Sequence, residues 1–276
     1  VAIAVARDYN REQLKSTISA AATSAAGLLE IQEDNSMLKP YNLGHASMSG
    51  LIAAEMGKTA SPGPDDILGG KRGMLRLLGG EINQQFLNRT DDFEIERIYV
   101  KSYAACRHCH TAIEAVLKLR DKNISANYIK EINVYTYKMA INGHDHKEIK
   151  GKSSAKLSIP YSVASAYVLG KSDIESFEDK NIKDKHILEL TKKVNVLEKK
   201  EYTEQSSKKR ISQVQIVTVD GKQLCETVEF AKGDPENPMS HQEIIDKYFQ
   251  MMEWANSREQ GEEILNKIQR EGEKLL

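Results

Sequence analysis

Apolar positions in the first 90 residues recur with the spacing of a helix. Residues 11–33 carry small and apolar side chains throughout, residues 44–56 form a second such stretch, and "KRGMLRLLGG" (71–80) is a third that stops at a glycine pair. Between them, "SPGPDDILGG" is typical of a turn in which an aspartate caps a short helix through Ile67 and Leu68. Alanine-rich stretches of high helix propensity favour closely packed inner helices. This part of the chain is therefore predicted to be helical.

The pattern changes after Asp92. Residues 93–103 and 128–137 alternate apolar and polar positions and are rich in β-formers, so both are predicted strands. Residues 210–230 predict a hairpin, because two alternating runs flank Asp220-Gly221. Helices are expected at about 155–169 and 184–196. The segment thus predicts an α+β unit with a small, largely antiparallel sheet.

The last segment returns to a helical pattern. Pro235 and Pro238 force an extended crossing, and Ser240 with Glu243 forms a capping-box pair that opens an apolar-faced helix. We expect this helical pair to pack on the first helical region. The predicted organisation is a helical domain (1–96), an α+β domain (97–232) and a returning helical part (233–276), in the α+β fold class.

Composition narrows the function classes. The 276 residues carry 39 basic and 40 acidic groups, for a formal charge of −1, so no nucleic-acid partner is expected. Three cysteines cannot form a closed disulfide framework, which favours a reducing, cytoplasmic location. The opening "VAIAVARDYN" is apolar for only six residues, too few to cross a bilayer, so no membrane partner is expected either.

Reactive groups gather just before one predicted helix. The stretch "KSYAACRHCHTAIEAVLKLR" (101–120) places seven of them ahead of a run with helical periodicity: Lys101, Tyr103, Cys106, Arg107, His108, Cys109 and His110. They are predicted to crowd the entrance of the helix.

One interpretation of "CRHCH" is a zinc site, because Cys106, Cys109 and His110 have ligand-type spacing. A structural site needs a fourth ligand, and outside this motif the sequence offers only Cys225 and the His144/His146 tract "NGHDHKE". That tract has its own simpler interpretation as a solvated loop. The sequence therefore favours no metal and no cofactor.

Five blocks of the sequence carry a resemblance to a known family. They are "KPYNLGHASMSGLIAAEM", "PDDILGGKRGMLRLLGG", "KSYAACRHCHTAIEA", "AKLSIPYSVASAYVLG" and "GDPENPMSHQEI", and they run along nearly the whole chain. In this order and spacing they resemble the MmgE/PrpD family. That family includes 2-methylcitrate dehydratases, cis-aconitate decarboxylases and iminodisuccinate epimerases, which act beside carboxylates of small polycarboxylic acids.

The resemblance implies a helical domain built from both chain ends, an inserted α+β lid, and a site between them. Lys101, His108 and His110 match a lysine and histidines of the family motif, and Tyr161 matches a tyrosine implicated in the decarboxylase branch. Cys106 is a departure, because decarboxylase-like proteins have a histidine there. This departure favours dehydration or epimerisation over decarboxylation.

Chemistry assigns roles to these residues. Removing a proton next to a carboxylate requires a base together with cationic groups that stabilise the developing charge. Lys101, His108 and Tyr161 are the predicted catalytic residues, with His108 able to titrate near neutral pH. Four further residues are predicted to bind substrate, with Arg107 able to hold a carboxylate through two parallel hydrogen bonds: Cys106, Arg107, His110 and Lys156.

The predicted function is a lyase or isomerase that acts on a small di- or tricarboxylic acid. Alternatives are a cis-aconitate-type decarboxylase and a catalytically incomplete chain that serves as a binding or assembly module. A homodimer through the helical domain is expected. The resemblance also implies a further helical region ahead of the point where this sequence begins. The chain alone is therefore expected to be inactive or nearly so, and a separate N-terminal chain, or the rest of its own precursor, is expected to complete the site.

Overall fold

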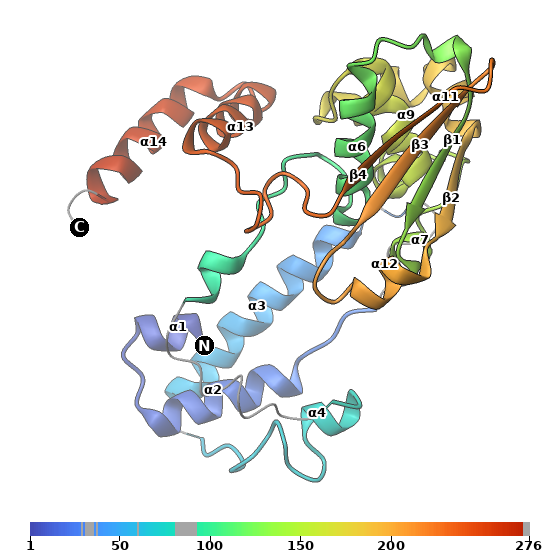
Figure 1. Ribbon diagram of the computed structural model, residues 1–276. Coiled ribbons are helices and arrows are strands. Elements are labelled where there is room, and N and C mark those ends of the chain that lie inside the picture. The colour runs from blue at the N-terminus through green and yellow to red at the C-terminus, as the bar shows by residue number, and fades with distance from the viewer. Residues whose placement is uncertain (29, 31–35, 37, 60, 81–92, 273–276) are drawn as a thin grey trace. The chain divides into compact units, whose positions relative to one another are not determined.

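The computed structural model describes residues 1–276 except 29, 31–35, 37, 60, 81–92 and 273–276. The chain divides into two compact units, Val1–Asp92 and Phe93–Leu276, called below the N-terminal and C-terminal units (Figure 1). Helices are combined with a four-stranded sheet of mixed pairing. The predicted α+β class is therefore confirmed.

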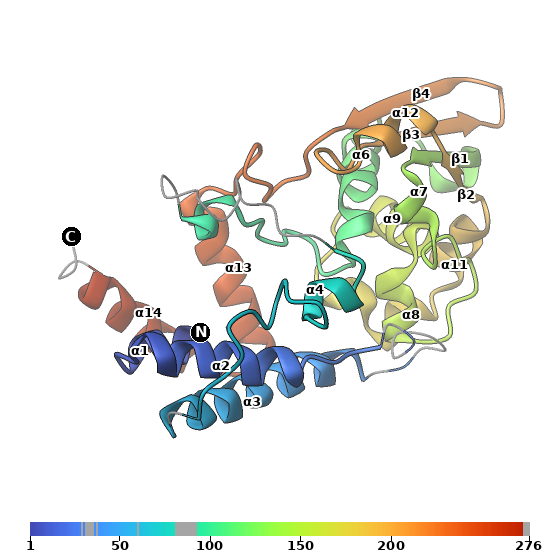
Figure 2. The ribbon, with the colours of Figure 1, turned by 90° about the horizontal axis from the view of Figure 1, so that it is seen from below.

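The described part of the N-terminal unit is helical, as predicted. Its helices are α1 (Ala2–Ala6), α2 (Arg11–Thr23), α3 (Lys39–Lys58) and α4 (Met74–Leu77). Helices α2 and α3 lie side by side (Figure 2). A Cβ atom on Gly57 would come within 2.0 Å of Thr17 Oγ1, so only glycine allows this close approach of α3 to α2.

Two predictions within this unit need correction. The helix expected over 11–33 ends at Thr23, and Gly27 follows with a φ of +144°, a conformation outside the helical region; residues 29 and 31–33 lie outside the described residues. The short helix expected near Ile67 is a turn in which Asp66 Oδ1 accepts a hydrogen bond from the Gly69 N–H at 2.6 Å. The aspartate thus closes a turn where a helix cap was expected.

The C-terminal unit is organised around one sheet. Its strands are β1 (Ile129–Thr136), β2 (Val194–Glu198), β3 (Ser212–Thr218) and β4 (Gln223–Val228), in the order β2-β1-β3-β4. The β1/β3 and β3/β4 pairs are antiparallel and β1/β2 is parallel. The predicted strand at 128–137 and the hairpin at 210–230 are thus confirmed, in a largely antiparallel sheet.

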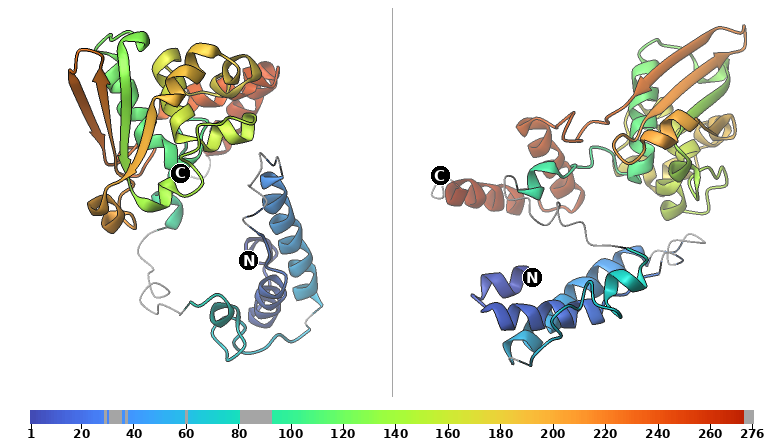
Figure 3. Two further views of the ribbon diagram at one scale, coloured as in Figure 1. Left: turned by 90° about the vertical axis from the view of Figure 1, so that its right-hand side faces the viewer. Right: turned by 60° about the horizontal axis from the view of Figure 1, so that its bottom comes forward.

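Helices cover one side of this sheet, as the left view of Figure 3 shows. The helices between the motif and β3 are α6 (His110–Arg120), α7 (Lys138–Ile141), α8 (Lys152–Leu157), α9 (Ile159–Leu169), α10 (Asp179–Ile182), α11 (Lys185–Lys192) and α12 (Lys200–Gln205). Of these, α7 and α12 lie at the ends of the strands (Figure 1). Helix α6 packs on β3 and β4 and α9 packs on β2. Ile113 and Val116 of α6 and Val214 of β3 are fully buried and belong to the hydrophobic core of the unit.

The strand predicted at 93–103 is wrong. Residues Glu94–Arg97 form a 3-10 turn, and Phe93 and Ile95 are 75% and 72% exposed. The apolar side chains of this alternating pattern are therefore not packed in a core. The Val100 N–H donates to the Gly233 carbonyl at 2.8 Å, which ties the extended stretch before the motif to the loop after β4.

Two predicted helices have different bounds. The helix expected over 155–169 is broken at Ser158, whose hydroxyl accepts from the Tyr161 N–H and so starts α9 as a new helix. The helix expected over 184–196 ends at Lys192, and Val194 and Val196 instead pair with Ile132 and Val134 of β1. β-branched residues favour the strand at this point.

The C-terminal unit closes with two helices, α13 (His241–Trp254) and α14 (Arg258–Gly272). The predicted capping box at Ser240 and Glu243 starts α13 as expected. The Tyr248 hydroxyl donates to the Gly261 carbonyl at 2.9 Å and joins the two helices. No helix in the described ranges has the length and apolar character needed to cross a bilayer. Packing of this pair on the N-terminal unit stays a prediction.

Candidate active site

The reactive stretch forms the loop that leads into α6. The Cys106 N–H donates to the Lys156 carbonyl at 2.8 Å, and residues Arg107–Cys109 make a 3-10 turn that continues directly into α6. The predicted crowding of reactive groups at a helix entrance is therefore confirmed. In such a tight turn successive side chains point in different directions, so neighbours in sequence reach different surroundings.

One group of side chains from this loop meets a histidine from elsewhere. Cys106, His108 and His144 each offer one sulfur or ring nitrogen, and these atoms all lie within 4.8 Å of one another. Cys106 Sγ is 3.4 Å from His144 Nε2, and the rings of His108 and His144 are 5.0 Å apart. All three side chains are partly exposed. We call these three residues the Cys-His-His cluster.

Two neighbours orient the rings of the cluster. His144 Nδ1 lies 2.7 Å from the Asn142 carbonyl, which only accepts, so Nδ1 carries a proton. In the neutral ring, Nε2 is then the acceptor that faces Cys106. His108 Nδ1 lies 2.6 Å from the Tyr137 hydroxyl. Burial raises the pKa of Tyr137 above its ordinary value, so this hydroxyl keeps its proton at neutral pH.

A second group is cationic. Lys101 is exposed, with its ammonium 3.3 Å from the Ala105 carbonyl. Lys247 of α13 reaches the same loop, where its ammonium donates to the Lys101 carbonyl at 2.5 Å. Burial, followed by the charge of Lys101, lowers the pKa of Lys247. Two ammonium groups near one another favour an anion that relieves their repulsion.

His110 occupies a buried position at the first residue of α6. Its Nε2 is 3.3 Å from the same Ala105 carbonyl, and its ring packs against Tyr103. Burial, followed by the charge of Arg107, lowers the pKa of His110 to about 3. His110 is therefore neutral at physiological pH and is packed into the fold; its predicted contact with substrate stays a prediction.

Arg107 is part of a buried ion pair. Its Nη2 contacts both carboxylate oxygens of Asp234, and the two side chains are only 8% and 10% exposed. The guanidinium also lies over the Tyr99 ring, 5.2 Å from its centre. The carboxylate partner of Arg107 is therefore Asp234, and the predicted contact with a substrate carboxylate stays a prediction.

The remaining predicted residues lie apart from the cluster or beside it. Tyr161 is fully buried in α9, where its hydroxyl donates to the Ser176 carbonyl at 2.8 Å. Cys109 is buried in the core, and burial raises its pKa, so it is not a reactive thiol. Lys156 is partly buried beside Cys106, to which its backbone is bonded. The proton-transfer role of Tyr161 and the substrate contact of Lys156 stay predictions.

Three residues of the site were not among the predicted ones. His144 was noted in "NGHDHKE" but interpreted as solvated, and Tyr137 and Lys247 were placed only as strand and helix residues. Their local sequence gives no sign of a functional role. These residues approach the loop before α6 only through the tertiary packing of β1, the 142–151 loop and α13. The Cys106, Cys109, His110 zinc set is also dispersed: only Cys106 of these three belongs to the Cys-His-His cluster.

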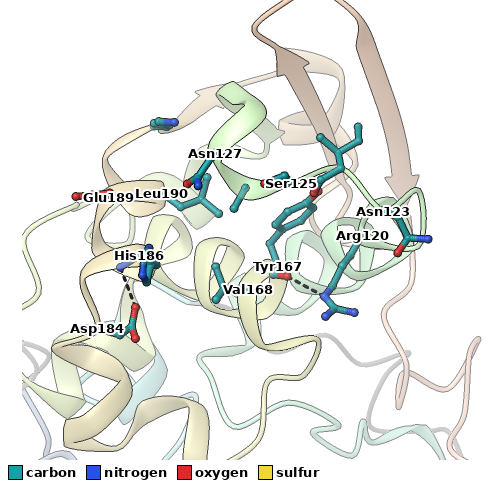
Figure 4. Close-up of a pocket in the computed structure, with 13 residues that line it drawn as sticks. Arg120, Asn123, Ser125, Asn127, Tyr167, Val168, Asp184, His186, Glu189 and Leu190 are labelled. Atoms are coloured by element: carbon teal, nitrogen blue, oxygen red, sulfur yellow. Dashed lines mark hydrogen bonds between the residues drawn. The ribbon is translucent and has the colours of Figure 1, made fainter.

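A separate groove of about 510 Å³ lies between the end of α6, α9 and α11 (Figure 4). No residue of the cluster lines it. Its polar groups serve the fold, since Arg120 Nε donates to the Tyr167 carbonyl at 2.9 Å and Asp184 accepts from the His186 N–H at 2.8 Å. The groove therefore does not coincide with the predicted site.

Comparison with known proteins identifies the family. Residues 1–86 match the MmgE/PrpD N-terminal domain, and residues 103–271 match the MmgE/PrpD C-terminal domain. A search of curated proteins gave no match. The two matched domains cover most of the chain, in the order in which the two units occur. The chain therefore belongs to the MmgE/PrpD family, whose members are generally enzymes of the dehydratase type.

Proposed function

We propose that this protein is a lyase or isomerase that removes a proton next to a carboxylate of a small di- or tricarboxylic acid. The observation that carries this proposal is the hydrogen bond between His108 Nδ1 and the Tyr137 hydroxyl. When His108 Nδ1–H donates to the oxygen of this neutral hydroxyl, Nε2 carries a lone pair and is oriented to accept a proton. Membership of a generally dehydratase-type family supports the same class of reaction.

In the proposed mechanism His108 is the base. Nε2 of His108 takes the proton from the carbon next to the carboxylate, and the resulting imidazolium keeps Nδ1–H directed at the Tyr137 oxygen. Lys101 and Lys247 bind the carboxylate whose charge increases as the proton leaves. The charge of Lys101 contributes to the lowered pKa of Lys247. A bound anionic substrate would stabilise the protonated ammonium and raise this pKa again.

The later step distinguishes the branches of the family. In a dehydratase the next event is loss of hydroxide with a proton from an acid, and in an epimerase it is return of the proton to the other face of the carbon. Tyr161 is the proposed acid, although its hydroxyl is directed at Ser176 in this structure. We favour dehydration or epimerisation over decarboxylation, because Cys106 stands where decarboxylase-like proteins have a histidine.

The test is incubation of the protein with citrate, 2-methylcitrate, cis-aconitate and iminodisuccinate in deuterated water. Deuterium at the carbon next to the carboxylate without net conversion indicates epimerisation. Loss of water or of carbon dioxide indicates the other branches. Binding of one of these acids without exchange or conversion would instead favour the alternative of a binding module.

A further inference from the structure

We propose that Cys106, His108 and His144 form a binding site for a zinc-class divalent ion, with three protein ligands and an open fourth position. The three side chains offer one sulfur and two nitrogens within 4.8 Å of one another. This site differs from the zinc set that the spacing of Cys106, Cys109 and His110 had indicated. The proposal concerns binding alone. Since Nδ1 of His108 faces the Tyr137 hydroxyl, the ion takes Nε2, the nitrogen proposed above as the base, so metal binding and that proton transfer are alternative uses of His108.

The distances suit a tetrahedral ion. With a metal–sulfur distance of about 2.3 Å and a metal–nitrogen distance of about 2.0 Å, neighbouring ligand atoms are about 3.5 Å apart. Cys106 Sγ and His144 Nε2 are already 3.4 Å apart. His108 lies within the same 4.8 Å limit, so a small rotation of its side chain brings the third ligand into place.

The surroundings of the ligands are those of a metal site. Metal-binding histidines generally donate their second ring N–H to a carbonyl or carboxylate, which fixes the ring. His144 does so to the Asn142 carbonyl at 2.7 Å, and this directs the Nε2 lone pair at Cys106. The Tyr137 hydroxyl restrains the ring of His108 at 2.6 Å from Nδ1.

The ligand types select the ion. Thiolate and imidazole favour Zn²⁺ and Co²⁺ over Mg²⁺ and Ca²⁺, which prefer oxygen ligands. Binding converts the Cys106 thiol to a thiolate, with release of its proton to solvent. One thiolate leaves the bound ion with a net positive charge, so an anion or a water molecule suits the fourth position. Three ligands with one open position are typical of catalytic zinc sites.

The experiment uses the full chain, stripped with a chelator and titrated with Co²⁺ as a spectroscopic substitute for Zn²⁺. We expect a thiolate-to-cobalt charge-transfer band that saturates at one ion per chain and is removed by Zn²⁺. Cys106→Ser should abolish the band, and His144→Ala should weaken binding by at least about 10-fold, the lower end of the loss seen even for outer partners of metal ligands. Circular dichroism of each variant checks that it is folded.

Two cysteine controls separate this site from other thiols. Cys225→Ser changes an exposed cysteine of β4 outside the cluster and should keep the full band. Cys109→Ala tests the thiol indicated by sequence spacing and should also keep it. Absence of a charge-transfer band in the unmodified chain, or its retention in a folded Cys106→Ser variant, would overturn the proposal. Turnover plays no part in this readout, so failure of the proposed reaction leaves the result interpretable.

Discussion

His108 owes its proposed role to residues that are distant from it in sequence. Its own loop supplies the imidazole, but Tyr137 at the end of β1 fixes the ring and His144 lies beside it. Sequence analysis could place Lys101, Cys106 and His108 together because they share one loop. It could not identify Tyr137, His144 or Lys247 as their neighbours, because these residues come close to the loop only through tertiary packing.

Replacement of His108 by alanine should therefore lower turnover by at least ~10²-fold, the usual scale for loss of a positioned base. The side chain is partly exposed, so the melting temperature should change little. Steady-state kinetics and thermal unfolding measure the two effects. His186→Ala is the matched control, because this histidine is exposed and lines the separate groove. A loss of activity that only follows a loss of folding would point to a structural role for His108.

His110 makes a prediction about stability and pH. Its pKa in the folded protein is about 3, against an ordinary value of 6.5, because it is buried. Between these values the unfolded chain binds a proton that the folded chain does not, so stability falls as the pH decreases from about 6.5 towards 3. The resulting loss in the free energy of unfolding from this one residue is at most about 5 kcal/mol.

The variant that tests this is His110→Gln, whose side-chain amide still donates to the Ala105 carbonyl but does not titrate. The free energy of unfolding, measured in urea at several pH values, should depend less on pH below 6.5 than in the unmodified protein. The control variant His186→Gln should show the same pH dependence of the free energy of unfolding as the unmodified protein. An equal slope for His110→Gln would show that His110 is protonated in the folded state.

At the scale of elements, local pattern predicted strands well where a partner strand exists. The hairpin β3–β4 and strand β1 formed where the alternation indicated them. The same alternation at 93–103 gave no strand, because no described strand pairs with it; the Val100 N–H donates instead to the Gly233 carbonyl in the loop after β4. Strand β2 was missed, since its pairing with β1 is parallel and depends on the long crossover through α8 to α11.

The Arg107–Asp234 ion pair ties the loop before α6 to the loop after β4. Loss of one partner leaves a buried charge without compensation, so Arg107→Met or Asp234→Leu should each destabilise the protein by about 3–5 kcal/mol. The double variant removes both charges and should cost clearly less than the sum of the two. Urea unfolding of all four proteins gives the coupling energy. As a control, Lys183→Met removes an exposed ion pair with Asp179 and should change stability by less than about 1 kcal/mol.

At the scale of the whole molecule, the two units differ in how much apolar surface they bury. The core cluster of the chain lies within residues 105–228. In the described part of the N-terminal unit, the fully buried apolar residues are only Ala4, Ala53 and Ala54. Large side chains of α3 remain exposed there, with Leu43 at 73% and Ile52 at 57%. The predicted homodimer through this helical part stays a prediction, and light scattering that shows a monomer at micromolar concentration would contradict it.

This difference predicts that residues 93–276 fold when produced alone, whereas residues 1–92 do not. Burial of large apolar side chains is the main favourable contribution to folding, and three alanines bury little surface. The isolated 93–276 segment should show one cooperative thermal transition and keep the near-ultraviolet circular dichroism of its buried tyrosines, which include Tyr137 and Tyr161. The isolated 1–92 segment should show little helix and no cooperative transition, since α2 and α3 pack mainly on each other. Mixing the two segments is the decisive control: helix gained on mixing would show that the C-terminal unit completes the fold of the first. A cooperative transition of 1–92 by itself would contradict the prediction.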